Sequence, residues 1–350
     1  MPLNPGGLHA RPGLAAARLG TVQRSAVLRL AIGVAISAIF LGLTLARVDL
    51  PQAAAAIGAA APAGLALALA IVLVDLALRA LRWKVLLDHL AGDQAGPPFR
   101  LAFGYLTIGF LANAVLPARL GDVARAYLAG ATFPGGRLAI LGSVVVERVA
   151  DGLTMLALAA LSVLAVGAVA GTGDLVVVGT IAAGAGVVGL VVAWFLLVRT
   201  RLGSSRAGVL VAGLAARVGA GANALRSPRP AATVVALTGL MTTTAVLVAA
   251  SVTGAVGLDL SPIEVVLFLS GVALSLAIPA APGAIGTYEF VGVTIITSLG
   301  YSPEQGLATI LLMRVLTTLP PVLLGVVSVW VLQVRPGELV RPATTAATEP

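Results

Sequence analysis

The sequence predicts an all-α, polytopic membrane protein, and three observations support this prediction. Hydrophobic residues make up 59% of the 350 residues, and charged residues make up only 10%. The mean hydropathy is +1.06. The apolar residues occur in long runs without a sustained period of two, which is typical of membrane helices. Since a soluble domain needs about a quarter of its residues charged, most of this surface is expected to face lipid.

Nine apolar runs divide the chain. They cover residues 27–46, 60–78, 101–116, 139–170, 175–198, 231–257, 263–278, 285–299 and 306–332. Six of them are long enough to span a bilayer. The other three, 101–116, 263–278 and 285–299, measure about 24 Å at ~1.5 Å per residue. That length is shorter than the ~30 Å hydrocarbon core, so these three runs need another arrangement.

Basic residues mark one side of the predicted membrane. They lie before the first run, between the second and third runs, in the segment 199–230 and after the last run. Arg79, Arg82 and Lys84 are assigned to the second of these loops. The opposite loops contain few Lys or Arg residues. The positive-inside rule therefore predicts a multi-pass protein of the cytoplasmic (inner) membrane, with the N- and C-termini in the cytoplasm.

The short runs favour re-entrant helical hairpins, which enter and leave the membrane on the same side. Arg100 and Arg137 bracket the first hairpin on the predicted cytoplasmic side, and Asp259 and Glu304 bracket the second on the other side. The prediction is about six spanning helices plus two hairpins in an inverted-topology repeat. The alternative is eight to nine short spans.

The predicted domain organisation follows from this repeat. A transmembrane domain covers residues 27–333, with repeat halves at about 27–170 and 175–333. Polar cytoplasmic tails cover residues 1–26 and 334–350, and the first of them is expected to be flexible.

Both halves repeat one plan at their helix breaks. Pro removes a backbone donor and Gly permits the turn that follows. Each break precedes an acid, Asp122 or Glu289, and the next apolar run carries Arg148 or Arg314 at nearly the same interval. The residues predicted to form the breaks are Asn113, Pro117, Gly121, Pro279, Pro282, Gly283 and Gly286.

Charged side chains within or beside the apolar runs predict a site at mid-membrane. Such a charge costs roughly 2.5–3.5 kcal/mol at a helix centre. Broken helices with free N–H groups, together with Arg side chains, can bind a phosphate. The alternative is a set of structural ion pairs. The predicted phosphate-binding residues are Arg119, Arg125, Arg148 and Arg314, and their predicted charge partners are Asp122, Glu147, Asp151 and Glu289.

Other kinds of site are not expected. The chain has no Cys, and its two histidines are His9 and His89, so we expect no metal site and no cofactor. The net charge of +8 comes from basic residues in short loops rather than on one face, so no nucleic-acid partner is expected. Trp83, at the predicted end of the second helix, is expected to be an interface anchor.

The motifs at the breaks resemble those of the transmembrane region of lysylphosphatidylglycerol synthases and of related stand-alone flippase-like proteins. The resemblance covers roughly residues 25–333 and also includes Leu81, Arg82 and Trp83. Asp122 stands where Glu is usual, and Ala284 where Gly is usual. The matching residues are Asn113, Leu116, Pro117, Arg119, Gly121, Asp122, Arg125, Glu147, Arg148, Asp151, Pro279, Pro282, Gly283, Ile285, Gly286 and Glu289.

The resemblance implies translocation of a membrane lipid or a lipid-linked headgroup. Synthase members of the family join this region to a cytosolic aminoacyl-transferase domain, which we expect to be absent because only residues 334–350 follow the last run. The chain is therefore expected not to be an enzyme, and its partners are expected to be membrane lipids and a lipid synthase or glycosyltransferase. The alternatives are a membrane-embedded enzyme acting on a lipid-linked substrate and a structural subunit of a lipid or glycan pathway.

Overall fold

The computed structural model describes residues 33–115, 120–133, 136–170, 219–276 and 282–334. Every regular element in these ranges is a helix, so the all-α prediction is confirmed for the described part of the chain. The predicted run 175–198, Pro117, Arg119 and Pro279 lie outside the described residues.

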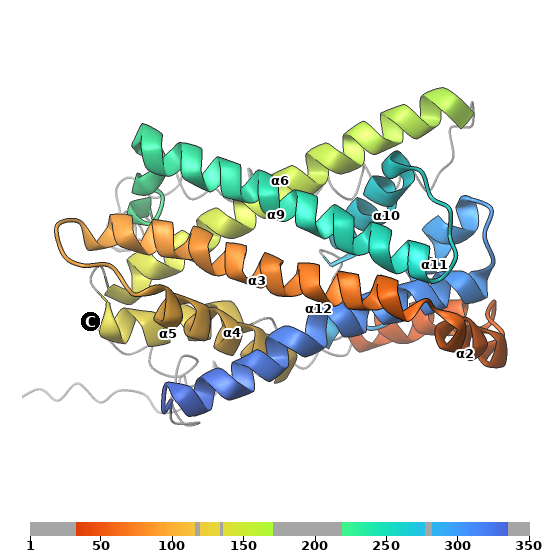
Figure 1. The fold of residues 1–350 in the computed structure, drawn as a ribbon, viewed down its shortest axis with the longest axis horizontal. Coiled ribbons are helices and arrows are strands. Elements are labelled where there is room, and N and C mark those ends of the chain that lie inside the picture. Colours follow the sequence, from red (N-terminus) through yellow and green to blue (C-terminus); the bar gives the residue numbers. More distant parts are fainter. Residues whose placement is uncertain (1–32, 116–119, 134–135, 171–218, 277–281, 335–350) are drawn as a thin grey trace, which may run out of the picture.

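Three long helices run along the long axis of the molecule (Figure 1). They are α3 (Pro62–Ala91), α9 (Pro228–Ala255) and α12 (Pro303–Val331), and each is long and apolar enough to cross a membrane. A helix at Gly33–Leu45 and the short α2 (Leu50–Ala59) meet at 81° and could together form a fourth span. The multi-pass character is therefore confirmed, whereas the predicted total of six spans reaches into residues that the structure does not describe.

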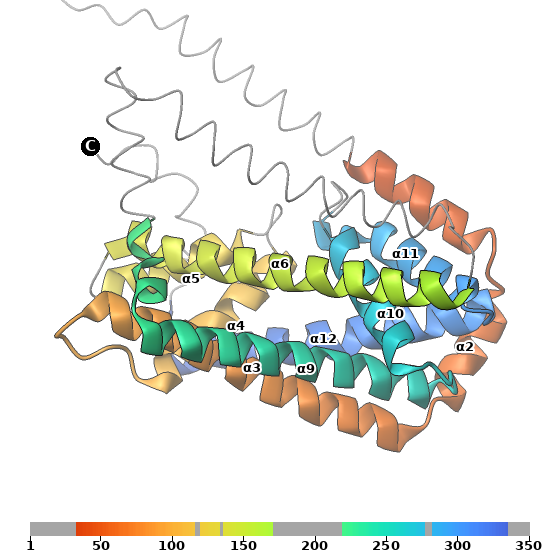
Figure 2. The ribbon, with the colours of Figure 1, turned by 90° about the horizontal axis from the view of Figure 1, so that it is seen from above.

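A fourth long helix, α6 (Gly136–Ala170), has 35 residues and carries charges in its first half. It lies on one face of the molecule, across α5 (Gly121–Thr132) and α10 (Pro262–Ser275), while α3 and α9 pack together on the other face (Figure 2). A turn of 3₁₀ helix, η2 (Asn223–Arg226), precedes α9. The charged part of α6 is thus enclosed between α3 and the hairpin that contains α5.

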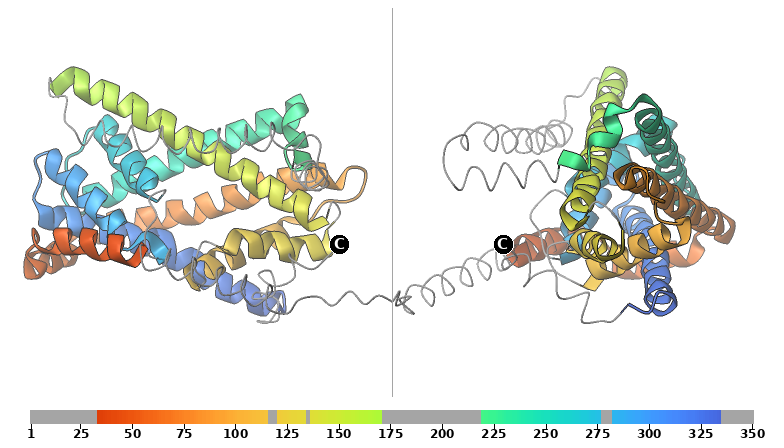
Figure 3. Two further views of the ribbon diagram at one scale, coloured as in Figure 1. Left: turned by 180° about the vertical axis from the view of Figure 1, so that it is seen from behind. Right: turned by 90° about the vertical axis from the view of Figure 1, so that its left-hand side faces the viewer.

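Two helical hairpins lie at opposite ends of the bundle (Figures 1 and 3). The first consists of α4 (Phe99–Val115) and α5, and the second of α10 and α11 (Thr287–Ser298), with the short η3 (Pro282–Ala284) between them. In the described residues α4 ends at Val115 and α5 begins at Gly121, while α10 ends at Ser275 and α11 begins at Thr287. Asn113, predicted as a break residue, lies inside α4, in its last turn. Helices α4 and α10 are apolar but only 17 and 14 residues long.

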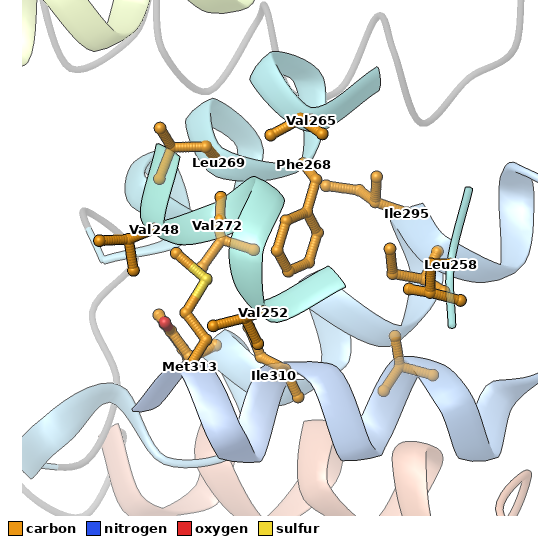
Figure 4. Close-up of a cluster of buried hydrophobic side chains, with 14 of the residues drawn as sticks. Val248, Val252, Leu258, Val265, Phe268, Leu269, Val272, Ile295, Ile310 and Met313 are labelled. Atoms are coloured by element: carbon orange, nitrogen blue, oxygen red, sulfur yellow. The ribbon is translucent and has the colours of Figure 1, made fainter. Parts of the chain in front are cut away.

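A continuous apolar core joins the second hairpin to the long helices (Figure 4). Phe268 and Val272 of α10 contact a cluster that includes Val252 of α9 and Met313 of α12, and Phe268 is fully buried. Lipid tails are as apolar as these side chains, so close packing rather than the hydrophobic effect holds such helices together. The core therefore fixes the position of the hairpin relative to α12.

Small residues bring α4 and α12 into close contact. A side chain at Gly325 would overlap the backbone carbonyl of Thr107. The hydroxyls of Thr107 and Ser328 lie 2.9 Å apart across the same seam. Such seams of small and hydroxyl residues are typical of membrane helix pairs, and this one ties the first hairpin to the last helix.

The predicted end of the second helix is wrong. The run 60–78 was expected to end before Arg79, but α3 continues to Ala91. Two i,i+4 ion pairs support the continuation, Arg79 with Asp75 and Lys84 with Asp88. Arg79 and Lys84, which suggested a loop, thus lie on a helix. Each is paired with a carboxylate one helical turn away. Trp83 is completely buried and is not the expected interface anchor.

Candidate functional site

In the first hairpin, the start of α5 lies very close to α4. A Cβ at Gly121 would overlap the carbonyl oxygen of Gly109, so only glycine fits at this position. The side-chain oxygen of Asn113 accepts the N–H of Gly121 at 2.8 Å. These contacts hold the start of α5 against the end of α4 and place Asp122 in the first turn of α5.

Six charged side chains from α3, α5 and α6 form one group, which we call the α5–α6 charge cluster. Its members are Arg82, Asp122, Arg125, Glu147, Arg148 and Asp151. Three are cations and three are anions, so the cluster as a whole is formally neutral. This balance lowers the cost of placing charge among apolar helices.

The inner part of the cluster is fully enclosed. Arg125 Nη2 donates to Glu147 Oε2 at 2.7 Å, and these side chains are 1% and 3% exposed. Arg82 donates two hydrogen bonds to the carboxylate of Asp151, at 2.6 Å from Nη1 and 3.2 Å from Nη2. Its Nη1 also donates to the hydroxyl of Thr238 in α9 at 3.1 Å. Arg82 therefore connects α3, α6 and α9 at one point.

The outer part of the cluster is open. Arg148 Nε lies 3.0 Å from Asp122 Oδ2, and its Nη1 lies 3.9 Å from Asp151 Oδ2. The exposed fraction is 43% for Arg148, 21% for Asp122 and 24% for Asp151. A ligand that reaches the cluster would thus meet Arg148 first, flanked by two carboxylates.

An aromatic ring supports the inner arginine. The Arg125 guanidinium lies 4.9 Å from the ring centre of Trp83, and the Trp83 indole N–H donates to Ser143 at 3.1 Å. Two Arg125 nitrogens, Nε and Nη1, have no hydrogen-bond partner among the described residues. The π face of Trp83 offers this buried cation a favourable contact in place of a hydrogen bond.

Sequence reasoning missed Arg82, Trp83 and Thr238 as members of the site. Arg82 and Trp83 were placed in a loop or at its edge because three cations closely follow the apolar run. The pairs Asp75–Arg79 and Lys84–Asp88, each four residues apart, were the available signal that the helix continues. Nothing local marks Thr238, because its contact with Arg82 joins residues 156 positions apart.

The second break has a different local geometry. Gly286 has a φ of 91°, and a Cβ there would overlap the carbonyl oxygen of Ser37 in the helix Gly33–Leu45. Glu289 Oε2 accepts the N–H of Gly286 at 2.7 Å and so closes the start of α11. The carbonyl of Gly283 accepts a hydrogen bond from Arg314 Nη1 at 2.8 Å.

A single ion pair stands beside this break. Arg314 Nη2 of α12 lies 2.8 Å from Glu289 Oε1, and the two side chains are 24% and 7% exposed. The Arg314 guanidinium also lies 4.4 Å from the ring centre of Tyr288. Arg314 is therefore held by a carboxylate, a backbone carbonyl and an aromatic ring.

The structure brings together the residues that the sequence paired in each half. Asp122 contacts Arg148, and Glu289 contacts Arg314. None of the ion pairs between described residues joins Arg314 to the α5–α6 charge cluster. The two groups are thus separate ion-pair systems, one on each hairpin.

The expected free N–H groups at the breaks are not free at their first positions. The N–H of Gly121 is taken by Asn113, and the N–H of Gly286 is taken by Glu289. The carboxylates that follow the breaks lie in the first helical turns, where they already offset the helix dipole. At these two positions the backbone N–H groups are therefore occupied, and Arg148 and Arg314 are the partly exposed cations beside the breaks.

The fold and these charge groups define a class: a multi-pass helical membrane protein with ion pairs on two broken hairpins. The model of the lysylphosphatidylglycerol synthase TM region matches residues 30–325, and the chain belongs to this family. A curated relative, "Glycosyltransferase AglD" of Haloferax volcanii, is 28% identical over 326 residues, which cover 80% of this chain. The chain spans about half of that relative, since the match covers 50% of its length.

Proposed function

We propose that this protein translocates a membrane lipid or a lipid-linked headgroup, using the charged groups on its two hairpins. One observation carries the proposal: in both halves the first carboxylate after the break pairs with an arginine of the next long helix, at 3.0 and 2.8 Å. Structural neutralisation alone does not require the same arrangement in two hairpins that lie at opposite ends of the bundle.

The proposed topology makes each hairpin re-entrant. With helices of 17 and 12 residues in the first hairpin and 14 and 12 in the second, each arm reaches roughly 18–26 Å at ~1.5 Å per residue. Two such hairpins entering from opposite faces would bring both breaks toward mid-membrane, as in inverted-repeat transporters. In this arrangement the basic loops and both termini face the cytoplasm, and the protein lies in the cytoplasmic membrane.

The proposed site assigns different tasks to its arginines. Arg148 and Arg314 are partly exposed and would bind the headgroup phosphate directly. Arg125 is 1% exposed, so in this conformation it would act by holding Glu147. Arg119 is proposed as a further phosphate ligand because it lies in the first break. Asp122, Glu147, Asp151 and Glu289 would neutralise the arginines when no lipid is bound.

The relative's name supports a lipid or glycan pathway as the setting. A lipid-linked sugar combines an apolar tail with a phosphate headgroup, which suits a site with exposed arginines among apolar helices. The natural partners in such a pathway are a glycosyltransferase or a lipid synthase. The second candidate is therefore a membrane-embedded enzyme that acts on a lipid-linked substrate, and the name of the relative is what favours it.

Reconstitution into liposomes tests the proposal. Purified protein is incorporated with fluorescent phospholipids, and the fraction of lipid protected from an external quencher is followed with time. The parent protein is expected to lower the protected fraction. Asp122→Asn and Glu289→Gln keep the shape of the side chain and remove its charge. In both variants the protected fraction of lipid is expected to stay constant with time, and the purified protein is expected to remain monodisperse. Parental rates in both variants would contradict the proposed site.

A further inference from the structure

A cavity of about 240 Å³ lies apart from both ion-pair systems, between the helix Gly33–Leu45, α11 and the start of α12. Figure 2 shows this helix beside α11. Leu43, Phe290, Val293 and Pro303 give it apolar walls, and Arg47 contributes a guanidinium. We call it the Arg47 groove.

The groove is closed at one end and open at the other. Toward the break, Gly286 packs directly on the backbone of Ser37, and the rings of Phe40 and Phe290 lie 4.8 Å apart. One to two turns further along, the helix Gly33–Leu45 and α11 are separated by the cavity, which Leu43 and Val293 line. The groove therefore extends along α11 from a tight aromatic contact toward Arg47.

Arg47 is the cation that lines this groove. It is exposed, lies just after the helix, and forms no ion pair with another described residue. The two nearby acids are engaged elsewhere: Asp49 accepts the N–H of Gln52 at 3.2 Å, and Glu304 accepts the N–H of Asp49 at 3.1 Å. The Arg47 guanidinium is thus available to an anionic ligand.

We propose that the Arg47 groove binds one anionic phospholipid, with its phosphate on Arg47 and part of an acyl chain between the helix Gly33–Leu45 and α11. The apolar walls of the groove match an acyl chain, and Arg47 matches a phosphate. Arg binds phosphate with a planar set of donors. An apolar cavity of about 150 Å³ already holds benzene, so this larger space accommodates a stretch of hydrocarbon chain.

A phospholipid fits better than a free anion for a positional reason. Arg47 follows the end of an apolar helix, where lipid phosphates lie at the membrane boundary. The hydroxyls of Thr44, Thr297 and Ser298 donate back to carbonyls of their own helices, so these three lining hydroxyls are not available as donors to a small soluble anion. The proposed site does not depend on translocation, since neither charge group at the breaks lines it.

The test uses phosphatidylglycerol with a photoreactive group in its acyl chain, at low mole fraction in phosphatidylcholine liposomes with the full chain. After irradiation, mass spectrometry measures the labelled fraction of peptides from residues 33–47 and 287–303. Arg47→Gln is expected to lower this fraction about tenfold, the loss that follows from one charged hydrogen bond. Thr294→Trp, which fills the groove and keeps Arg47, is expected to lower it similarly.

Arg226→Gln is the matched control, because Arg226 is also exposed and lies in η2, away from the groove. Its labelling is expected to equal that of the parent, and excess soluble glycerol phosphate is expected not to compete. Unchanged labelling in both Arg47→Gln and Thr294→Trp would overturn the proposal. So would an equal loss in Arg226→Gln, which would indicate general charge attraction, or full competition by glycerol phosphate, which would indicate a site for free anions.

Discussion

The guanidinium of Arg314 lies 2.8 Å from the carboxylate of Glu289. Glu289 lies in the first turn of α11, directly after the break, and Arg314 lies in the next helix, α12. Asp122 and Arg148 stand in the same order and make the same kind of contact at 3.0 Å. Both arginines remain partly exposed although each has a carboxylate partner. Arg148 can exchange Asp122 for a phosphate while Asp122 keeps its contact with Arg125. Glu289 is buried and would keep the N–H of Gly286 as a partner if Arg314 moved to a phosphate.

If the two pairs serve one transport cycle, Arg148→Gln and Arg314→Gln should have equal effects. Each removes one phosphate-binding group, worth about 1.5–3 kcal/mol as a charged hydrogen bond, so translocation is expected to slow by roughly tenfold or more. The liposome protection assay measures the rate. Arg226→Gln, in η2, is the control and should keep the parental rate. A large effect in one half and none in the other would assign the site to a single hairpin.

The enclosed part of the charge cluster should control stability rather than transport. Glu147→Gln leaves Arg125 and Arg82 without a nearby carboxylate that both contact, and loss of one partner of a buried pair costs about 3–5 kcal/mol. The double change Arg125→Met and Glu147→Leu leaves Arg82 with Asp151 and should recover much of this loss. The midpoint of thermal unfolding in detergent measures the stability of the single and the double variant.

Arg148→Gln is the matched comparison, because Arg148 is 43% exposed. Its loss of unfolding free energy is expected to stay near or below ~1 kcal/mol, as for other open ion pairs. A midpoint for Arg148→Gln as low as that for Glu147→Gln would show that the open and enclosed pairs contribute alike, contrary to their burial.

Gly121→Ala should prevent the first hairpin from closing, because its Cβ would overlap the carbonyl of Gly109 and the side chain of Asn113. The expected result is a strong loss of monodisperse protein. Gly152→Ala in α6 has no other atom within 4 Å of the added Cβ, so it should be neutral or stabilising by up to about 1 kcal/mol. Equal yields of the two variants would disprove the close approach of α4 and α5.

The proposed re-entrant topology can be tested with introduced cysteines, because the chain has none. An impermeant thiol reagent outside intact cells should label Ser302→Cys but neither Gln94→Cys nor Val115→Cys. Labelling of Gln94→Cys after permeabilisation is the control for reactivity. Val115 lies at the tip of the first hairpin and is 74% exposed, so its labelling from outside would show that α4 spans the membrane.

The sequence alone predicted the features that depend on local order along the chain. Hydropathy predicts the helical membrane class. Pro and Gly close together predict the helix breaks near residues 117–121 and 279–286, whereas Pro320 and Pro321 lie inside α12 and end no helix. The interval between carboxylate and arginine in each half was likewise visible, since Asp122–Arg148 and Glu289–Arg314 repeat it. The i,i+4 pairs of α3 were also present, but the clustered cations outweighed them and ended the predicted helix too early.

Only the tertiary structure decided which charges share a site and which are enclosed. Arg82 meets Asp151 across 69 positions and Thr238 across 156, and Arg125 rather than Arg148 takes Glu147. Such partners depend on how α3, α5, α6 and α9 pack. The spacing of residues along one helix determines which side chains share a face, but the face that another helix presents is determined by packing of the whole bundle.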